Sequence, residues 1–342
     1  MPQPPLDLNK YLAQSLPHLR DQYPPGTGGT GPRVEFNGSL KGVQVIEDFD
    51  EQVLKYTKTL PSDPIIPHPH FKYPKFVHAI SNISNPIKSP SDLQKALSTL
   101  PLAAITSVLT ALDADPEDLK VGVTGGQALD RAGYESDGGE DLDGKTENKA
   151  ILPDRTKAWT FKFSKSPMGS GEFLLSQGNS DDIKLVVRTI NSSAFTPEDW
   201  KEYIVSGPYR YDTKSKASWY WSRSYGATKR LGCQYYVLTD WQRWTFGYFN
   251  PDGTHGYASP ILEDDAANPS VLQALLFWTR SAIGAENAWQ PNQKDVSGLP
   301  QLFPANPARR ISSATGSKPS VPRDERKPRK ANESDIEESD AE

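Results

Sequence analysis

The chain has 342 residues, a formal net charge of −5 and a single cysteine. This length allows one large domain or two small ones. One cysteine excludes an intramolecular disulfide and a zinc site built on cysteines, and the acidic balance means that any nucleic-acid surface has to be local. No apolar run reaches the ~18 residues of a membrane helix and the N-terminus lacks a signal peptide, so we expect a soluble, intracellular protein without a membrane partner.

The N-terminal third divides into two segments. Residues 1–35 are rich in proline and glycine and are predicted to be disordered apart from a short helix at 8–16. Residues 36–122 are predicted to be a helical extension, because apolar residues recur there at helical spacing. Its predicted elements are a strand at 43–46 and helices at 49–60, 92–100 and 101–114.

An acidic segment separates this extension from the core of the chain. Residues 123–149 hold six glycines and seven acidic residues without periodicity, a pattern typical of a mobile loop. Residues 150–288 alternate short apolar strands with helices and are predicted to be an α/β domain. Its first predicted elements are strands at 157–163 and 183–190 and a helix at 197–205.

The stretch from Ser218 to Phe249 is the most ordered pattern in the chain. It predicts an amphipathic helix, a turn at Gly232, and two strands at 234–238 and 243–249 that are enriched in β-branched and aromatic residues. A helix that leads into a hairpin indicates a core in which the helix covers one face of a sheet. An edge strand at 257–262 and a helix at 271–283 are predicted to complete the domain.

The C-terminal residues 289–342 are predicted to be a disordered tail, basic at first and then acidic. The sequence Lys327-Pro328-Arg329-Lys330 resembles a nuclear-import signal, and Ser334 and Ser339 resemble acidic-directed kinase sites. We therefore expect a nuclear protein with protein partners for this charged tail, the alternative being an ordinary solvated tail.

The order of elements in residues 150–285 resembles a known plan. Pro153-Asp154, a strand, a turn, a second strand, a helix and an aromatic hairpin are similar to the PD-(D/E)xK, or restriction-endonuclease-like, superfamily, and most similar to a divergent fungal group of such domains. The shared phrase after the helix consists of Gly232, Tyr235, Val237, Leu238, Thr239, Trp244 and Phe246. The resemblance implies a three-layer α/β fold with a central mixed sheet flanked by helices.

The resemblance also implies where a metal site would lie. Active members bind Mg²⁺ through an aspartate that opens the first hairpin and through (Asp/Glu)-x-Lys at the end of the next strand, for metal-assisted phosphodiester hydrolysis. Asp154 fits the first position, although an aspartate before a strand also caps turns. The next strand offers either Val187 and Thr189 or Arg188 and Ile190 at the second motif, and neither register supplies a carboxylate.

Two other carboxylates remain as candidates. Asp182 and Lys184 have the letters of the second motif, but they lie at the start of the strand instead of its end. Glu172 begins the preceding short strand. The resemblance therefore favours a non-catalytic member without a cofactor. The alternative is a Mg²⁺-dependent nuclease that uses Asp154 with Asp182 or Glu172, and Lys184.

Residues 209–230 combine cations with aromatic rings against the single acid Asp212. The cations are Arg210, Lys214, Lys216, Arg223, Lys229 and Arg230, and the rings are Tyr209, Tyr211, Trp219, Tyr220, Trp221 and Tyr225. Cations that contact phosphates and rings that stack on bases are typical of a nucleic-acid surface; alternatively the rings face the sheet and the charges face solvent. We predict a nucleic-acid-binding or nuclear interaction module, with a protein-interaction scaffold as the alternative.

Overall fold

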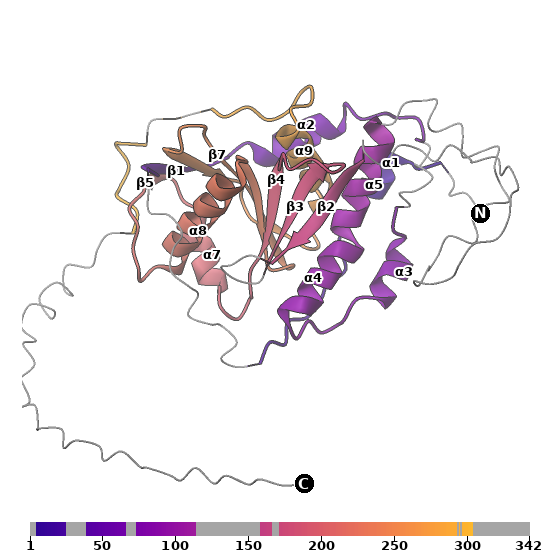
Figure 1. Ribbon diagram of the computed structural model, residues 1–342, viewed down its shortest axis with the longest axis horizontal. Helices are drawn as coiled ribbons and strands as arrows, with labels where there is room; N and C mark the ends of the chain where they lie inside the picture. Colours follow the sequence, from indigo (N-terminus) through magenta and orange to yellow (C-terminus); the bar gives the residue numbers. More distant parts are fainter. Residues whose placement is uncertain are drawn as a thin grey trace, which may run out of the picture. The chain divides into compact units, whose positions relative to one another are not determined.

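A mixed β-sheet crosses the described part of the chain, and helices cover both of its faces (Figure 1). The computed structural model describes residues 5–24, 39–65, 73–113, 158–165, 171–292, 294 and 296–303, all within one unit, Met1–Pro304. The strands are β1 (Gly42–Val45), β2 (Trp159–Ser164), β3 (Glu172–Gln177), β4 (Leu185–Thr189), β5 (Gly207–Pro208), β6 (Tyr235–Thr239), β7 (Arg243–Phe249), β8 (His255–Ala258) and β9 (Leu262–Glu263). The helices are α1 (Leu8–Leu12), α2 (Phe49–Thr57), α3 (Phe76–Ser81), α4 (Pro90–Thr99), α5 (Pro101–Asp113), α7 (Pro197–Tyr203), α8 (Lys216–Leu231) and α9 (Val271–Ala282).

The strands follow the order β2-β3-β4-β6-β7-β8-β1-β5, and β9 pairs with β7. β2, β3 and β4 form an antiparallel meander, β4 and β6 are parallel, and β6 and β7 form an antiparallel hairpin. β8 is antiparallel to β7 and parallel to β1. Because β1 lies in the N-terminal part of the chain, the extension predicted for residues 36–122 and the domain predicted for residues 150–288 share one sheet.

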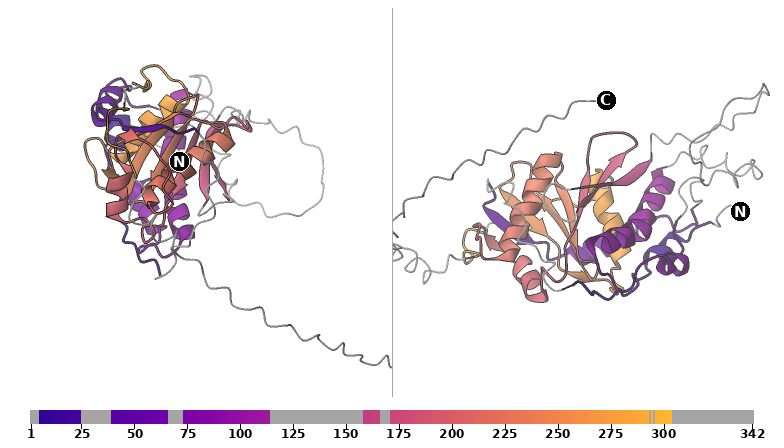
Figure 2. Two further views of the ribbon diagram at one scale, coloured as in Figure 1. Left: turned by 90° about the vertical axis from the view of Figure 1, so that its left-hand side faces the viewer. Right: turned by 60° about the horizontal axis from the view of Figure 1, so that its bottom comes forward.

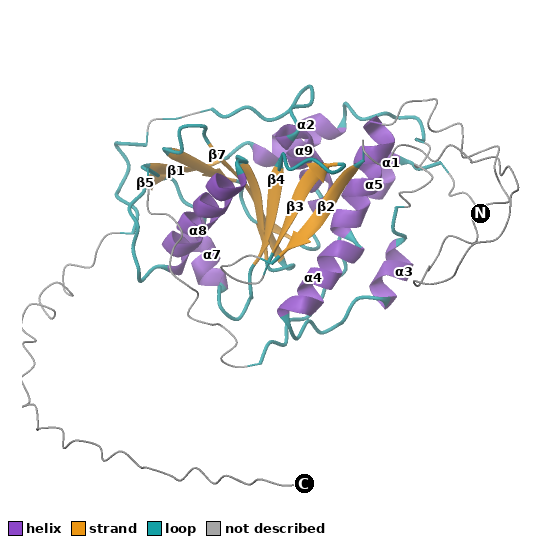
Figure 3. Cartoon of the chain, viewed as in Figure 1, coloured by secondary structure: helices purple, strands orange, loops and turns teal. Residues whose placement is uncertain are grey.

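Alternate residues of the central strands enter two hydrophobic layers. On β4, Leu185 and Val187 join the core beneath α2, α4, α5 and α9, whereas Val186 joins the core beneath α7 and α8. Figures 2 and 3 show these helical layers on either side of the sheet. All five residues of β4 are buried, as expected for a strand that is covered on both faces. The predicted α/β class, a mixed sheet flanked by helices, is confirmed.

The unit from α8 to β7 agrees with its prediction. The Ser215 hydroxyl accepts a hydrogen bond from the backbone N–H of Ser218 at the start of α8, and Gly232 ends the helix with a φ of 68°, a conformation that favours glycine. Trp221 of α8 stacks on Tyr203 of α7 with ring centroids 4.6 Å apart. This stack packs α8 against α7.

The edge strand predicted at residues 257–262 is wrong in its residue range and in its place at the edge of the sheet. β8 ends at Ala258 and lies inside the sheet between β7 and β1, while β2 and β5 end the described strand order. β1 lies more than two hundred residues earlier in the sequence, so no local pattern reveals that it covers this edge.

The N-terminal segment contributes more than the single predicted helix. Residues 5–24 bury a series of leucines in the same core as α4, α5 and α9: Leu6, Leu8, Leu12, Leu16 and Leu19. Among the described residues, the pair α4 and α5, Pro90–Asp113, is long and apolar enough to span a membrane, but 61% of its apolar window is buried within the protein.

Candidate functional site

A carboxylate and two arginines meet where β3, β4 and α8 come together. Glu172 is the first residue of β3 and lies directly opposite Arg188 of β4 in the antiparallel ladder. The Glu172 side chain is fully buried, with its Oε2 atom 3.9 Å from Nε of Arg188. Arg230, in the last turn of α8, donates from Nη2 to the Oε1 atom of Glu172. The three residues form an internal ion cluster.

The alternation of β3 explains why a glutamate is buried here. Phe173 and Leu175 face the core beneath α5 and α9, so Glu172 and Leu174 face α8. Gly171 precedes β3 with a φ of 93°, and a Cβ atom there would lie 2.4 Å from the ring of Phe163. The turn into β3 therefore requires glycine, which fixes the position of the glutamate.

A third arginine lies on α8, two turns before Arg230. Arg223 is 6% exposed, and its guanidinium lies 4.4 Å from the ring centroid of Trp219. Burial raises the pKa of Tyr220, and the positive charges of Arg223 and Arg188 oppose that shift.

Cys233 lies close to this cluster. Burial raises its pKa to about 12, and Glu172 adds to the shift while Arg230 opposes it. A thiol with this pKa stays protonated near neutral pH, and Cys233 packs in the core as a small buried side chain.

The partners of Glu172 that the structure describes are arginines and no second carboxylate. A metal ion beside Glu172 would need a second carboxylate within reach, but the residue across the ladder is an arginine. In the part of the chain that the structure describes, no group of three or more His, Cys, Asp or Glu side chains could hold a metal ion. Planar guanidinium groups instead match carboxylates and phosphates.

The carboxylates suggested by the sequence do not converge in the described residues. Asp182 forms an ion pair with Lys184, 2.6 Å apart, before β4 begins. Arg188, opposite Glu172, lies six residues further along, so Asp182 and Glu172 lie toward opposite ends of the β3–β4 pair. A surface depression of about 380 Å³ is lined by Trp159, Gln177, Asn179, Ser180, Asp182 and Lys184. Asp154 lies outside the described residues.

The cations predicted to bind nucleic acid occupy different surroundings. Arg210 and Lys214 are exposed, and Lys216 is exposed beside Asp199, 3.2 Å away. Lys229 lies 5.7 Å from the ring centroid of Tyr225, Arg223 lies over the ring of Trp219, and Arg230 pairs with Glu172. Tyr220, Trp221 and Tyr225 lie on α8, and their rings are buried in the core. For these rings the structure agrees with the alternative interpretation.

The features predicted for the tail lie outside the described residues. They are the import-like sequence Lys327 to Lys330 and the phosphorylation-like residues Ser334 and Ser339. Nuclear localisation and protein partners for the tail remain predictions.

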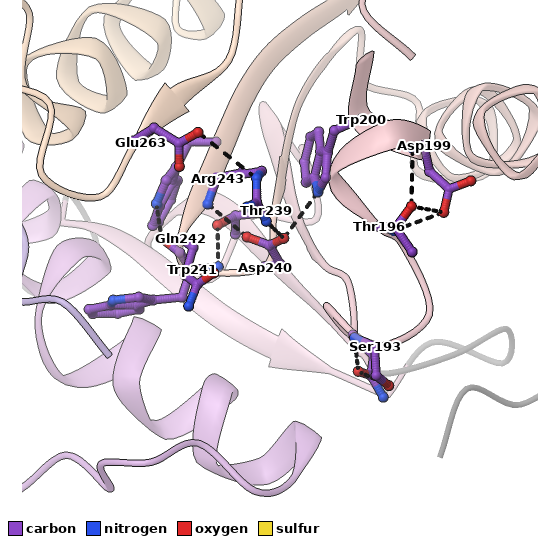
Figure 4. Close-up of polar contacts among 12 residues, drawn as sticks. Ser193, Thr196, Asp199, Trp200, Thr239, Asp240, Trp241, Gln242, Arg243 and Glu263 are labelled. Carbon is purple, nitrogen blue, oxygen red and sulfur yellow. Dashed lines mark hydrogen bonds and ion pairs between the residues drawn. The ribbon is translucent and has the colours of Figure 1, made fainter. Parts of the chain in front are cut away.

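A second buried carboxylate, which the sequence did not single out, lies at the end of β6. Asp240 is 1% exposed and accepts hydrogen bonds from the Trp200 indole at 3.0 Å, from the Arg243 backbone at 2.7 Å and from the Arg243 guanidinium at 3.3 Å (Figure 4). Burial raises its pKa to about 6, and the bonds from Arg243 and Trp200 oppose that shift. The only sequence signal was an aspartate at the start of the turn between two strands.

This carboxylate organises the junction of three segments. Its hydrogen bonds connect α7 with the β6–β7 turn. In the same turn, the Trp241 indole donates to the Pro17 carbonyl at 3.0 Å, and the Gln242 side-chain amide donates to the Leu19 carbonyl at 3.2 Å. The donors to Asp240 that the structure describes come from Trp200 of α7 and from Arg243 of β7. We therefore assign it a structural role.

Comparison with known proteins found no matching family model, no matching curated protein and no matching solved structure. The site therefore has to be interpreted from its own geometry.

Proposed function

We propose that the chain is a restriction-endonuclease-like domain that binds nucleic acid without hydrolysing it. The proposal draws support from the order of the sheet, in which a meander of β2, β3 and β4 is followed, through α8, by β6 parallel to β4. The motif residues Gly232, Tyr235 and Trp244, which carry the resemblance in sequence, lie at the end of α8 and in this hairpin.

The pairing of Glu172 with Arg188 carries the non-catalytic part of the proposal. A metal-dependent nuclease needs carboxylates on adjacent strands that share one ion. Here the cross-strand partner of the buried carboxylate is a guanidinium, and Arg230 neutralises it from the other side. Positive charge from the protein thus occupies the neighbourhood in which a cation would be bound.

The binding part rests on exposed cations that precede and begin α8. Arg210, Lys214 and Lys216 are exposed within seven residues of a chain whose net charge is −5. Lys216 also pairs with Asp199, so the local positive surface rests mainly on Arg210 and Lys214. The only acidic residue in this stretch is Asp212. Contacts of such cations with phosphates release counterions, which makes the affinity depend on salt.

The test compares two triple variants of the full chain. Binding of labelled single-stranded and double-stranded DNA and RNA is titrated at several salt concentrations. Replacing Arg210, Lys214 and Lys216 by alanine should reduce the slope of log affinity against log salt by about 0.7–0.9 for each phosphate that the variant no longer neutralises. A charge-matched control replaces Lys55 on α2, Lys58 directly after α2 and Lys95 on α4, all exposed, and should leave the slope unchanged. Absence of binding at low salt, or equal slopes for both variants, would contradict the proposal.

A further inference from the structure

The aromatic rings of residues 209–230 differ in exposure along the chain. Three rings are buried in the core: Tyr220, Trp221 and Tyr225. Three earlier rings are half-buried, so that part of each side chain reaches solvent: Tyr209, Tyr211 and Trp219. The half-buried rings therefore lie in the same short stretch as the exposed cations Arg210 and Lys214.

Hydrogen bonds hold the loop before α8 against the first turn of that helix. The Tyr209 hydroxyl donates to the Ser218 carbonyl at 2.8 Å, and the backbone N–H of Asp212 donates to the Ser218 hydroxyl at 2.8 Å. Tyr211 precedes Asp212 in the chain, and Trp219 follows Ser218. Bond lengths and the spacing of neighbouring Cα atoms then limit the Cα atoms of Tyr211 and Trp219 to a separation of about 12 Å or less.

Tyr211 takes the smallest part in packing among these half-buried rings. Tyr209 packs on Phe303 with ring centroids 6.0 Å apart. Trp219 packs in part against the core beneath α7 and α8, and the guanidinium of Arg223 lies 4.4 Å from its ring centroid. Among the described residues, Tyr211 lies outside both hydrophobic cores. Core packing therefore explains the position of the other two rings but not that of Tyr211.

The exposed cations of this loop are too few to bind a nucleic acid tightly by charge alone. Lys216 pairs with Asp199, and Asp212 adds a negative charge between Arg210 and Lys214. On a single strand, two neutralised phosphates correspond to a salt slope of only about 1.4. A base that stacks on an aromatic ring strengthens binding by roughly 5- to 150-fold. Rings beside the cations would therefore supply much of the affinity.

We propose that residues 209–216 and the first turn of α8 bind single-stranded nucleic acid, with Tyr211 and Trp219 stacking on bases and Arg210 and Lys214 contacting phosphates. This inference rests on the proposed function and names its substrate class. In a duplex the bases stack on one another, so their faces are closed to the rings and only the cations can contact the ligand.

The test titrates the full chain with one labelled oligonucleotide, either single-stranded or annealed to its complement, at several salt concentrations. The wild type should bind the single strand about tenfold more tightly or better. Tyr211→Leu keeps an apolar side chain but removes the ring, so it should weaken single-strand binding roughly 5- to 150-fold without changing the salt slope. Tyr211→Phe retains the ring and should bind as the wild type does. Duplex binding should be equal in all three proteins.

Other variants separate the rings from the charges. Arg210→Gln should lower the salt slope by about 0.7 on a single strand, because one phosphate contact is lost. Trp219→Leu should weaken single-strand binding as Tyr211→Leu does; if it does not fold, the two Tyr211 variants still decide the question. Phe163→Leu is the control, since it alters a ring that is 44% exposed on β2, at the opposite end of the described strand order from β5. It should leave binding unchanged.

The outcomes distinguish this inference from the proposed function. Equal affinity of the wild type for single and double strands, or wild-type single-strand affinity in Tyr211→Leu, would overturn the inference and leave the proposed function standing. Absence of binding to either form at low salt would overturn both. Displacement of the single strand by polyglutamate at an equal concentration of charges would show that the surface recognises charge alone, which would also overturn the role of the rings.

Discussion

Replacing Gly247 by alanine places a methyl group where the ring of Tyr236 lies. The two residues are opposite each other in the ladder between β6 and β7, and a Cβ atom at Gly247 would be 2.0 Å from Cζ of that ring. The ring cannot move away easily. Its hydroxyl is 2.8 Å from that of Tyr203 and donates to the Tyr257 carbonyl at 3.3 Å, and its face stacks on Phe249 with centroids 5.2 Å apart.

The expected cost follows from these contacts. Carbon atoms normally approach to about 3.5–4.0 Å, so the ring or the strand must shift by more than about 1 Å. Overpacking of a core typically costs about 1–3 kcal/mol, and two hydrogen bonds of the Tyr236 hydroxyl add about 1 kcal/mol each. We therefore expect Gly247→Ala to lower the free energy of unfolding by about 3–5 kcal/mol, a large part of the stability of an ordinary domain.

Two other glycines provide matched controls. Gly232→Ala meets no atom within 4 Å but has a φ of 68°, so it should cost only about 1 kcal/mol. Gly298→Ala meets no atom within 4 Å either, and its φ is not in the left-handed region, so its effect should be within about 0.5 kcal/mol. Urea unfolding followed by tryptophan fluorescence gives all three values. A loss for Gly247→Ala no larger than that for Gly232→Ala would refute the register of the hairpin.

Three further substitutions probe the two buried carboxylates. Glu172→Gln removes the negative charge beside the Arg188 side chain, which is 9% exposed, and should lower the free energy of unfolding in urea by about 3–5 kcal/mol. Glu202→Gln, at an exposed position of α7, should be nearly neutral, and equal losses would contradict the internal ion cluster. Burial raises the pKa of Asp240 to about 6, against ~3.9 in an unfolded chain, so its contribution to stability is present below about pH 4 and is lost as the pH rises through about 6. The free energy of unfolding of Asp240→Asn, relative to that of the wild type, should therefore rise by about 3 kcal/mol between about pH 4 and about pH 7. A difference that does not depend on pH would argue against a raised pKa. Trp200→Phe removes the indole N–H that donates to Asp240, so it should cost about 1–3 kcal/mol and move this pH transition upward; an unchanged transition would show that the indole has no effect on Asp240.

Local signals predicted the unit from α8 to β7 well because each of its boundaries has a local cause. Gly232 ends the helix, and alternating aromatic and β-branched residues mark the two strands. The position of β8 in the sheet could not be predicted in this way. Its neighbour β1 comes from a distant part of the chain, and pairing between distant strands leaves no trace in a local pattern.

The candidate site depends on register, which the sequence leaves open. The resemblance left open whether Val187 and Thr189 or Arg188 and Ile190 occupy the positions of the second motif, and the structure places Arg188 opposite Glu172. Arg230 completes the cluster from a helix 58 residues further along the chain. A one-residue shift in pairing would reverse the faces, so the ion cluster could not be derived from composition or spacing alone.

Whether the domain binds nucleic acid without cutting it is tested most directly by incubating the full chain with labelled DNA and RNA in Mg²⁺ and in Mn²⁺. One gel then reports both the shifted complex and any product. The pairing of Glu172 with Arg188 and Arg230 predicts a salt-sensitive shift with substrates of unchanged length. Metal-dependent cleavage that disappears in Asp154→Ala or Glu172→Gln would contradict the account.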